Sequence, residues 1–154
     1  MLLKRSLVCG TRIRSLTTYR RWEIDTFSPN LESLKMREYS DAPIVDSAFK
    51  LLVEVKAASI NPIDVLISQG YGHSLFRLAR LAIDSVSADK VTYDKFPMVL
   101  GRDFSGTVVN KGVGVNKFKI GQEVWGVIPP YINTGSHANL VVASADHVSA
   151  SLYP

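Results

Sequence analysis

The stretch that decides the fold of this chain runs from Pro97 to Gly126 and reads PMVLGRDFSGTVVNKGVGVNKFKIGQEVWG. Its glycines recur at short intervals among β-branched and aromatic residues, so each apolar run is one strand long before the backbone has to turn. Gly121 stands where a tight turn requires a positive φ, which other residues reach only at a cost. The stretch therefore predicts closely spaced strands, and strand geometry alone explains most of its glycines.

Strands on both sides of this stretch complete the prediction of a mostly β domain. The clearest lies at residues 49–57, where apolar side chains alternate with mostly polar ones, the period of a half-buried strand. Residues 22–27 and 34–39, separated by a turn at 28–30, are predicted to form an antiparallel pair. Further strands are expected at residues 123–128, 138–142 and 146–148.

The segment from Ser59 to Gly70 has the features of a short helix. Asn61 can cap its N-terminus, Pro62 at the first helical position loses no needed donor, and Gly70 can close it. Capping is by itself a sufficient role for Asn61. The side chains expected on the buried face are Ile63, Leu66 and Ile67.

A second helix is predicted at residues 74–83, and the polar residues 85–95 are expected to form a surface loop. Its arginines, Arg77 and Arg80, are expected on the more solvated side. The apolar residues that recur at helical spacing are Leu75, Leu78, Ala79 and Ala82.

The length of 154 residues fits one domain, and 46% hydrophobic with 21% charged residues is the composition of an ordinary soluble globular protein. The net charge of +4 is unevenly distributed, because six of the 18 basic residues lie in the first 21 positions and no acidic residue precedes Glu23. The remainder carries 12 basic residues against 14 acidic ones. This mildly acidic body gives no indication of a nucleic-acid partner. No later stretch approaches the roughly 18 uncharged apolar residues of a membrane span.

Residues 1–21 have the composition of a mitochondrial presequence, since they are rich in arginine, contain serine and threonine, and lack acidic residues. A chloroplast transit peptide and a disordered basic arm share this composition and stay open as alternatives. Basic residues interrupt any apolar core that a secretory signal would need. Import would also remove Cys9, the only cysteine, so the mature chain is expected to have no disulfide, no thiolate zinc site and no cysteine nucleophile.

Three blocks of sequence, taken in order, resemble one known family. The blocks are VEVKAASINPID at residues 53–64, PMVLGRDFSG at 97–106 and FKIGQEVW at 118–125. They resemble the N-terminal domain of the medium-chain dehydrogenases/reductases, and within that family the zinc-independent quinone-oxidoreductase branch. The resemblance covers residues 22–149 and leaves 150–154 as a short tail.

This resemblance implies a GroES-like fold, a partly open antiparallel barrel with short helices. Zinc-dependent relatives have a cysteine near Asn61 and a Gly-His-Glu sequence where this chain has Gly101, Arg102 and Asp103. Because a guanidinium is permanently charged and cannot coordinate a metal, catalysis without zinc is expected. A mutual structural pair of Arg102 with Asp103 is an alternative to any contact with substrate. The histidines without metal-ligand spacing are His73, His137 and His147.

The reaction implied by the resemblance is hydride delivery from NADPH to a quinone or an α,β-unsaturated carbonyl, followed by protonation. By resemblance, Asn61 binds the cofactor beside its nicotinamide. Tyr71 lies near the place of a cleft tyrosine in family members and is the candidate catalytic residue, with ordinary surface packing as the alternative. The resemblance also points to a reticulon-type protein as a partner.

The family's Rossmann domain, whose glycine-rich turn and helix N-terminus hold the pyrophosphate, is not expected in this chain. Gly112 and Gly114 lack a third glycine and lie between two predicted strands, so they fail the structural context of that motif. In one interpretation, the chain is the substrate-side domain of an NADPH-dependent oxidoreductase whose activity belongs to a longer product. In another, it is a truncated, non-catalytic isoform that acts as an interaction module. A free-standing GroES-like domain with an unrelated role is the third.

Overall fold

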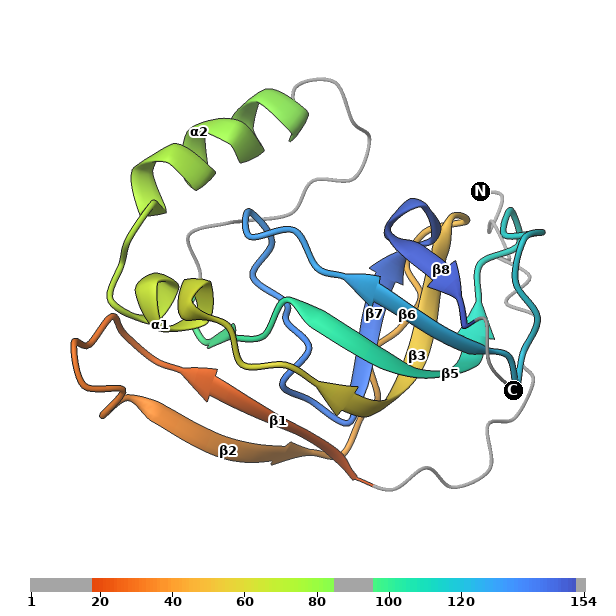
Figure 1. Cartoon of the computed structure of the whole chain (residues 1–154), viewed down its shortest axis with the longest axis horizontal. Helices are drawn as coiled ribbons and strands as arrows, with labels where there is room; N and C mark the ends of the chain where they lie inside the picture. The colour runs from red at the N-terminus through yellow and green to blue at the C-terminus, as the bar shows by residue number, and fades with distance from the viewer. Residues whose placement is uncertain (1–17, 85–95, 152–154) are drawn as a thin grey trace, which may run out of the picture.

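Strands and turns dominate the computed structural model of the chain, which describes residues 18–84 and 96–151 (Figure 1). In chain order the elements are β1 (Tyr19–Ile24), β2 (Leu34–Tyr39), β3 (Lys50–Ala58), α1 (Pro62–Ser68), α2 (His73–Asp84), β4 (Met98–Val99), β5 (Asp103–Lys111), β6 (Glu123–Val127), β7 (Leu140–Ser144), the 3-10 turn η1 (Ala145–His147) and β8 (Val148–Ala150). Each pair of adjacent strands among them is antiparallel. The predicted mostly β class with short helices is confirmed.

The strands form two sheets that do not close into one barrel. The smaller sheet has the order β2-β1-β4, and the larger has the order β7-β3-β5-β6-β8. An isolated bridge between Arg21 and Ala138 ties β1 to the segment before β7. Figure 1 shows the β1–β2 hairpin lying apart from the larger sheet, with α1 above one end of the hairpin. The arrangement confirms the mostly antiparallel, open fold that the resemblance implied, with two sheets that are not closed into a barrel.

The main hydrophobic core lies against the larger sheet. β3 pairs with β5 on one side and β7 on the other, and its Leu51 and Val53 are fully buried. Phe104 and Val108 of β5 belong to the same core, as does Phe118 from the loop before β6. Burying a phenylalanine side chain contributes roughly 1.5–3 kcal/mol. This core therefore anchors the loop between β5 and β6 to the sheet.

The tight turn before β6 needs glycine for its backbone conformation alone. Gly121 has a φ of +86°, and a Cβ at this position would meet no atom within 4 Å. The backbone N–H of Gln122 donates to the carbonyl oxygen of Lys119 at 3.2 Å and closes the turn. The positive φ predicted for Gly121 is confirmed.

α1 begins and ends close to the predicted positions. Asn61 is its N-cap, and Gly70, with a φ of +87°, follows its C-cap. The buried face differs from the prediction, because Leu66 is 39% exposed. The carboxylate of Asp64 is buried on this face instead, because it accepts a hydrogen bond from the backbone N–H of Gly101. The buried residues of α1 are Asp64, Ile67 and Ser68.

α2 confirms the second predicted helix, but it packs by a different face. Phe76 packs against a second, smaller core. Leu75, Leu78 and Leu81, in contrast, are 67%, 65% and 57% exposed. Successive helical residues are about 100° apart, so leucines at a spacing of three face away from Phe76. The loop predicted at residues 85–95 lies outside the described residues. The buried residues of the second core are Ile24, Ile67, Met98 and Leu100.

Strand boundaries differ from the sequence prediction near both ends of the chain. β1 begins at Tyr19, so it includes the last three residues of the segment predicted as a presequence, of which residues 1–17 lie outside the described part. At the other end, Asp146 and His147 were expected in a strand but belong to η1, and β8 follows at Val148–Ala150. β7 starts at Leu140, because Asn139 bonds instead to the backbone of Arg20.

Candidate functional site

Three polar side chains meet where β3 leads into α1. Asp103 Oδ2 accepts hydrogen bonds from Ser59 Oγ at 2.9 Å and from Asn61 Nδ2 at 2.5 Å. Asn61 Nδ2 also donates to Ser59 Oγ at 3.1 Å. The register of β3 and β5 places Ala58 opposite Phe104, which brings the residue after β3 next to the first residue of β5. We call Ser59, Asn61 and Asp103 the polar ring.

A buried carboxylate holds the backbone on one side of the polar ring. Asp64 is 2% exposed, and its Oδ2 accepts a hydrogen bond from the backbone N–H of Asn61 at 2.8 Å. Its Oδ1 accepts another from the backbone N–H of Gly101 at 2.9 Å. Asp64 lies in the first turn of α1, where the helix dipole favours a negative charge. It therefore joins the start of α1 to the segment that leads into β5.

Arg102 is buried next to this carboxylate, and its guanidinium donates hydrogen bonds to backbone carbonyl groups. Its Nη2 donates to the carbonyl oxygen of Val99 and its Nη1 to that of Pro129, both at 3.1 Å. Its Nε lies 3.8 Å from Asp64 Oδ1. The alternative of a mutual pair with Asp103 is not found, because Asp103 instead accepts hydrogen bonds from Ser59 and Asn61 in the polar ring.

Glycine is the only residue type that fits at position 101, between Asp64 on one side and Ser136 and His137 on the other. Its φ is +90°, and a Cβ there would lie 2.5 Å from Ser136 Oγ and from His137 Cδ2. Both the backbone conformation and the space therefore require glycine. This close approach lets the N–H of Gly101 reach Asp64.

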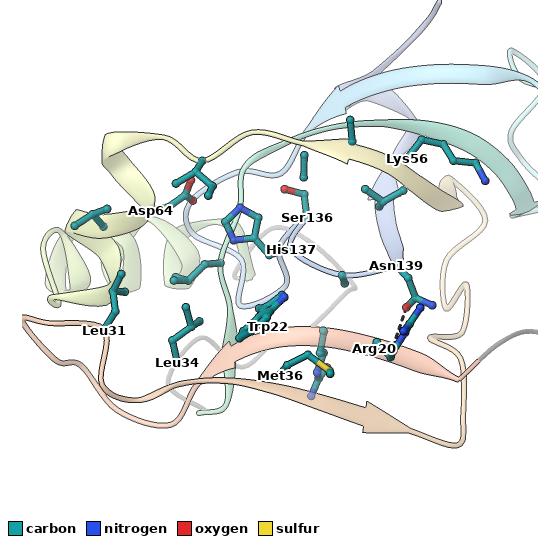
Figure 2. A pocket seen from close by; sticks show the side chains of 18 residues that line it. Arg20, Trp22, Leu31, Leu34, Met36, Lys56, Asp64, Ser136, His137 and Asn139 are labelled. Atoms are coloured by element: carbon teal, nitrogen blue, oxygen red, sulfur yellow. Dashed lines mark hydrogen bonds between the residues drawn. The ribbon is translucent and has the colours of Figure 1, made fainter.

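A cleft of about 680 Å³ lies between the β1–β2 hairpin and the end of β3, within the roughly 300–1,000 Å³ typical of small-molecule sites (Figure 2). Figure 2 shows Leu31 and Leu34 at one end and Arg20, Lys56 and Asn139 at the other. The cleft is thus apolar over much of its length, with basic side chains at one end. The apolar side chains that line it are Trp22, Leu31, Leu34, Met36, Ile60 and Val65.

Two polar residues lie at the centre of the cleft wall, where Figure 2 shows Ser136 and His137. His137 Nε2 lies 3.0 Å from the carbonyl oxygen of Ser59, so the ring nitrogen carries the proton at this contact. Ser136 Oγ is buried and has no hydrogen-bond partner among the residues that the structure describes. Within residues 18–84 and 96–151, no group of three or more His, Cys, Asp or Glu side chains is placed to hold a metal ion.

A shallower hollow of about 480 Å³ lies on the other side of the segment after β3. Ser59 and Asp103 of the polar ring line it together with Phe104, Trp125 and Val127. Trp125 is 53% exposed and Val127 is 42% exposed. The hollow therefore combines an apolar floor with a polar edge next to Asn61.

The two residues predicted for the site lie at opposite ends of α1. Asn61 precedes the helix and belongs to the polar ring. Tyr71 follows the helix, is 63% exposed, and lines neither the cleft nor the hollow. Its backbone N–H donates to the carbonyl oxygen of Leu66 at 2.9 Å. The sequence prediction missed Ser59 and the pairing of Asp103 with Asn61, which depend on a strand register between distant residues.

The β1–β2 hairpin carries a network of charged and aromatic side chains around a buried carboxylate. Glu23 has no exposed surface, and its carboxylate meets Arg21 Nε at 2.6 Å, Arg37 Nη1 at 3.0 Å and Tyr39 Oη at 2.8 Å. The Arg21 guanidinium also lies 4.3 Å from the centre of the Tyr39 ring. Burial opposes the charge of Arg21, but its contacts with Tyr39 and Tyr19 and the charge of Glu23 outweigh burial and raise its pKa. Burial raises the pKa of Tyr19.

The fold and the sequence identify the class of protein. Residues 47–150 match the alcohol dehydrogenase GroES-like domain, and the chain belongs to this family. Among medium-chain dehydrogenases/reductases it is similar to the N-terminal domain of the quinone-oxidoreductase branch, which confirms the predicted fold and family.

Individual relatives refine this assignment. Human NAD(P)H oxidoreductase RTN4IP1, mitochondrial, is 38% identical over 128 residues, which cover 83% of this chain and 31% of that protein. Reticulon-4-interacting protein 1, mitochondrial, of Caenorhabditis elegans is 35% identical over 133 residues, covering 86% of this chain and 34% of that protein. The structure of the quinone oxidoreductase from Coxiella burnetii matches with a TM-score of 0.67 and 29% identity, covering 89% of this chain and 38% of that chain.

The names of these relatives bear on the location of the chain and on its chemistry. The curated relatives are named as mitochondrial proteins, which confirms the predicted location. The human relative is named as an NAD(P)H oxidoreductase. The chain spans about a third of the length of the curated relatives it matches. In the described part of the chain, the helices are too short or too polar to cross a membrane.

Proposed function

We propose that the chain supplies the substrate-side domain of a mitochondrial NADPH-dependent oxidoreductase that reduces quinones or α,β-unsaturated carbonyls without zinc. The observation that carries this proposal is the place of Arg102. Where zinc-dependent relatives have a histidine, this chain has a buried guanidinium that donates to the carbonyl oxygens of Val99 and Pro129. A guanidinium has no lone pair to offer a metal, so its presence favours hydride transfer without a metal at this place.

The polar ring and the hollow beside it fit the nicotinamide half of NADPH. Phe104, Trp125 and Val127 offer an apolar floor for a flat ring, and Asn61 is bonded to two residues at the polar edge. When bound, NADPH supplies the hydride. The part of this chain is to orient the ring and to shelter it from water. Within the described residues, the turn with Gly112 and Gly114 joins β5 to β6 and does not lead into a helix. It therefore does not form a phosphate-binding turn for the other half of the cofactor.

Tyr71 is the proposed proton donor to the oxygen that becomes negative during reduction. Its side chain is exposed but lines neither the cleft nor the hollow, so this role requires that the substrate extend to the C-terminal end of α1. The apolar floor of the hollow supports a lipid-soluble quinone or enone as the substrate class, because the acceptor must stack against the nicotinamide to receive its hydride and apolar ligands gain from burial against such a surface.

The native protein, in the longest form that its gene produces, provides the test. We expect it to oxidise NADPH in the presence of a short-chain ubiquinone analogue or an enone, and a metal chelator is expected to leave the rate unchanged. Tyr71→Phe is expected to lower kcat by about 10²-fold or more, the usual contribution of a positioned acid. NADPH oxidation that a chelator abolishes, or that is absent with both acceptors, contradicts the proposal.

The second candidate function is that of an interaction module. Ile60 is 80% exposed, and with Trp125 and Val127 it leaves apolar surface uncovered on both sides of the polar ring. Contiguous exposed apolar surface marks a site for another protein surface. The name of the Caenorhabditis elegans relative makes a reticulon-type protein the partner to test. We expect Ile60→Asp to weaken binding of a reticulon to the 154-residue chain, and equal binding by both forms argues against this function.

A further inference from the structure

We propose that Trp125 and Asp103 make the hollow selective for the positively charged, oxidised form of the nicotinamide over the neutral, reduced form. This inference rests on the proposed function, because it takes the hollow as the place of the nicotinamide. It adds a preference for one charge state, which an apolar floor alone would not have.

Strand pairing places Trp125 and Asp103 on the same face of the larger sheet. Alternate residues of β6 are exposed, from Glu123 through Trp125 to Val127. Val127 lies opposite Asp103 of β5, and opposite side chains in an antiparallel pair project to the same face. Trp125 is therefore a diagonal neighbour of Asp103, a relation in which Cα atoms lie roughly 7–8 Å apart. Both residues line the hollow.

The indole ring of Trp125 is open to a ligand. Trp125 is 53% exposed, and the residues opposite it are Ser105 on β5 and Ser149 on β8. These serines are too small to cover the ring. The face of an indole carries the negative part of its quadrupole and attracts a cation. Trp125 therefore offers the hollow a flat apolar surface that also favours positive charge.

Asp103 adds a negative charge at the edge of the same hollow. Its hydrogen-bond partners, Ser59 and Asn61, are neutral side chains. Within residues 18–84 and 96–151, no basic side chain forms an ion pair with Asp103. Two neutral donors orient the carboxylate but leave its net charge in place, so its field acts on a ligand in the hollow.

The basic residues that flank the segments around the hollow have carboxylates of their own. Lys56, which precedes the lining residues of β3, pairs with Glu54 at 2.8 Å and lines the cleft. Arg102, which precedes Asp103, has its Nε 3.8 Å from Asp64 Oδ1 and is buried. Neither side chain lines the hollow. The charged groups of the hollow therefore favour a cation.

These two contributions separate the two forms of the nicotinamide. Both forms are flat rings that gain from apolar contact with Trp125, but only the oxidised form carries a positive charge. The quadrupole of the indole and the carboxylate of Asp103 therefore add to the binding of the oxidised form alone. Residues that favour this charge also stabilise it as it develops during hydride transfer.

The ratio of two dissociation constants tests the selectivity. The constants of NADP⁺ and NADPH are measured by calorimetry, at low ionic strength, for the native protein in the longest form that its gene produces. Trp125→Leu keeps an apolar side chain but removes the quadrupole, so we expect NADP⁺ to weaken about threefold relative to NADPH. Asp103→Asn keeps the size of the side chain but removes its charge, so a relative weakening of about fivefold is expected.

Matched controls make the same chemical changes elsewhere. Trp22→Leu replaces a tryptophan that lines the cleft and is 47% exposed, and Asp41→Asn replaces an exposed carboxylate that lines neither cavity. We expect both controls to keep the ratio of the unmodified protein. Adenosine 2′,5′-bisphosphate, which has no nicotinamide, is expected to bind equally to all five proteins.

Three results would overturn the inference and leave the proposed function standing. If the ratio stays constant in Trp125→Leu or in Asp103→Asn, the role of that residue is lost. Equal weakening of NADP⁺ and NADPH shows a contact that does not distinguish charge. A control that shifts the ratio as strongly as the corresponding variant shows that the effect does not come from the hollow.

Salt provides a second measurement that needs no variant, in case Asp103→Asn does not fold. The screening length falls from about 30 Å at 0.01 M to about 3 Å at 1 M salt. NADP⁺ and NADPH carry the same phosphates, so the ratio of their constants isolates the charge of the ring. We expect NADP⁺ to weaken about threefold relative to NADPH at the higher salt concentration, and a constant ratio overturns the role of Asp103. Failure of the unmodified protein to bind either form overturns the proposed function itself.

Discussion

The guanidinium of Arg21 lies 2.6 Å from the carboxylate of Glu23, a side chain with no exposed surface. Arg21 reaches this carboxylate because β1 begins at Tyr19 and pairs with β2 over six residues. The N-terminal half of β1 therefore neutralises the buried charge of Glu23 and completes the pairing with β2. A presequence that ended at Arg21 would take both contributions away when it was removed.

We expect a chain that starts at Trp22 to be less stable than one that starts at Thr18. The shorter chain loses a charged hydrogen bond to Glu23 and half of the β1–β2 ladder, so a loss of roughly 2–4 kcal/mol in the free energy of unfolding is expected. Urea unfolding at neutral pH measures the difference. As a control, Arg20→Gln in the longer chain is expected to be near neutral, because the paired groups of Arg20 are its backbone N–H and carbonyl. Equal stability of the two chains contradicts this prediction.

The same relationship limits where import processing can cut. We expect the mature protein from mitochondria to begin at or before Tyr19, so that β1 stays whole. Trypsin itself cleaves after Arg21, so free amino groups must be labelled before digestion and the labelled peptide identified by mass spectrometry. A labelled N-terminus at Trp22 or later would contradict the expectation.

Gly101 and Gly121 both have a positive φ, yet their substitution is expected to have unequal effects. Alanine at position 121 adds only backbone strain, since its Cβ would meet no atom within 4 Å, and costs about 1 kcal/mol. Alanine at position 101 adds the same strain and a clash with Ser136 and His137, so a loss above about 3 kcal/mol is expected. Thermal unfolding of the two variants compares them. Similar melting temperatures would show that the segment around Gly101 moves to make room.

Arg102 is expected to be a residue of structure rather than of substrate binding. Arg102→Met leaves the carbonyl oxygens of Val99 and Pro129 without their donor and removes the cation beside Asp64, so a loss of roughly 3–5 kcal/mol is expected. Lys119→Met, at an exposed residue, is the control and is expected to be nearly neutral. Chemical denaturation of both variants measures the effect. Full stability of Arg102→Met with a raised KM for the quinone would instead place Arg102 in the substrate site.

Local patterns predicted most of the β structure correctly. The alternation at residues 49–57 identified β3 to within one residue, and Asn61 with Pro62 marked the start of α1. These signals are local, because they depend on side-chain period and on unpaired backbone groups at a helix end. The start of β1 was missed because the basic composition of residues 1–21 extends into the first half of the strand.

The features that the sequence did not predict depend on contacts between distant residues. In α2 the leucines recur at helical spacing, and only the position of the second core decides that Phe76 faces inward instead of them. The contact of Asn61 with Asp103 joins residues 42 positions apart through the pairing of β3 with β5.

Alkaline pH is expected to destabilise the fold through Tyr19. Burial is the main cause that raises its pKa, and the neighbouring Arg21 opposes the rise while Glu23 and Tyr39 add to it. A raised pKa means that the folded chain prefers the neutral phenol. Its contribution to stability is therefore complete below the ordinary tyrosine value of about 10 and is lost as the pH rises through the higher folded value.

Urea unfolding at pH 8, 10 and 11 tests this sign. We expect the unmodified chain to lose more stability than Tyr19→Phe between pH 10 and pH 11, because phenylalanine has no proton to release. Tyr71→Phe removes an exposed tyrosine and is expected to keep the pH dependence of the unmodified chain. Identical slopes for the unmodified chain and Tyr19→Phe would mean that the Tyr19 hydroxyl is as well solvated in the folded chain as in the unfolded one, and that β1 does not bury it.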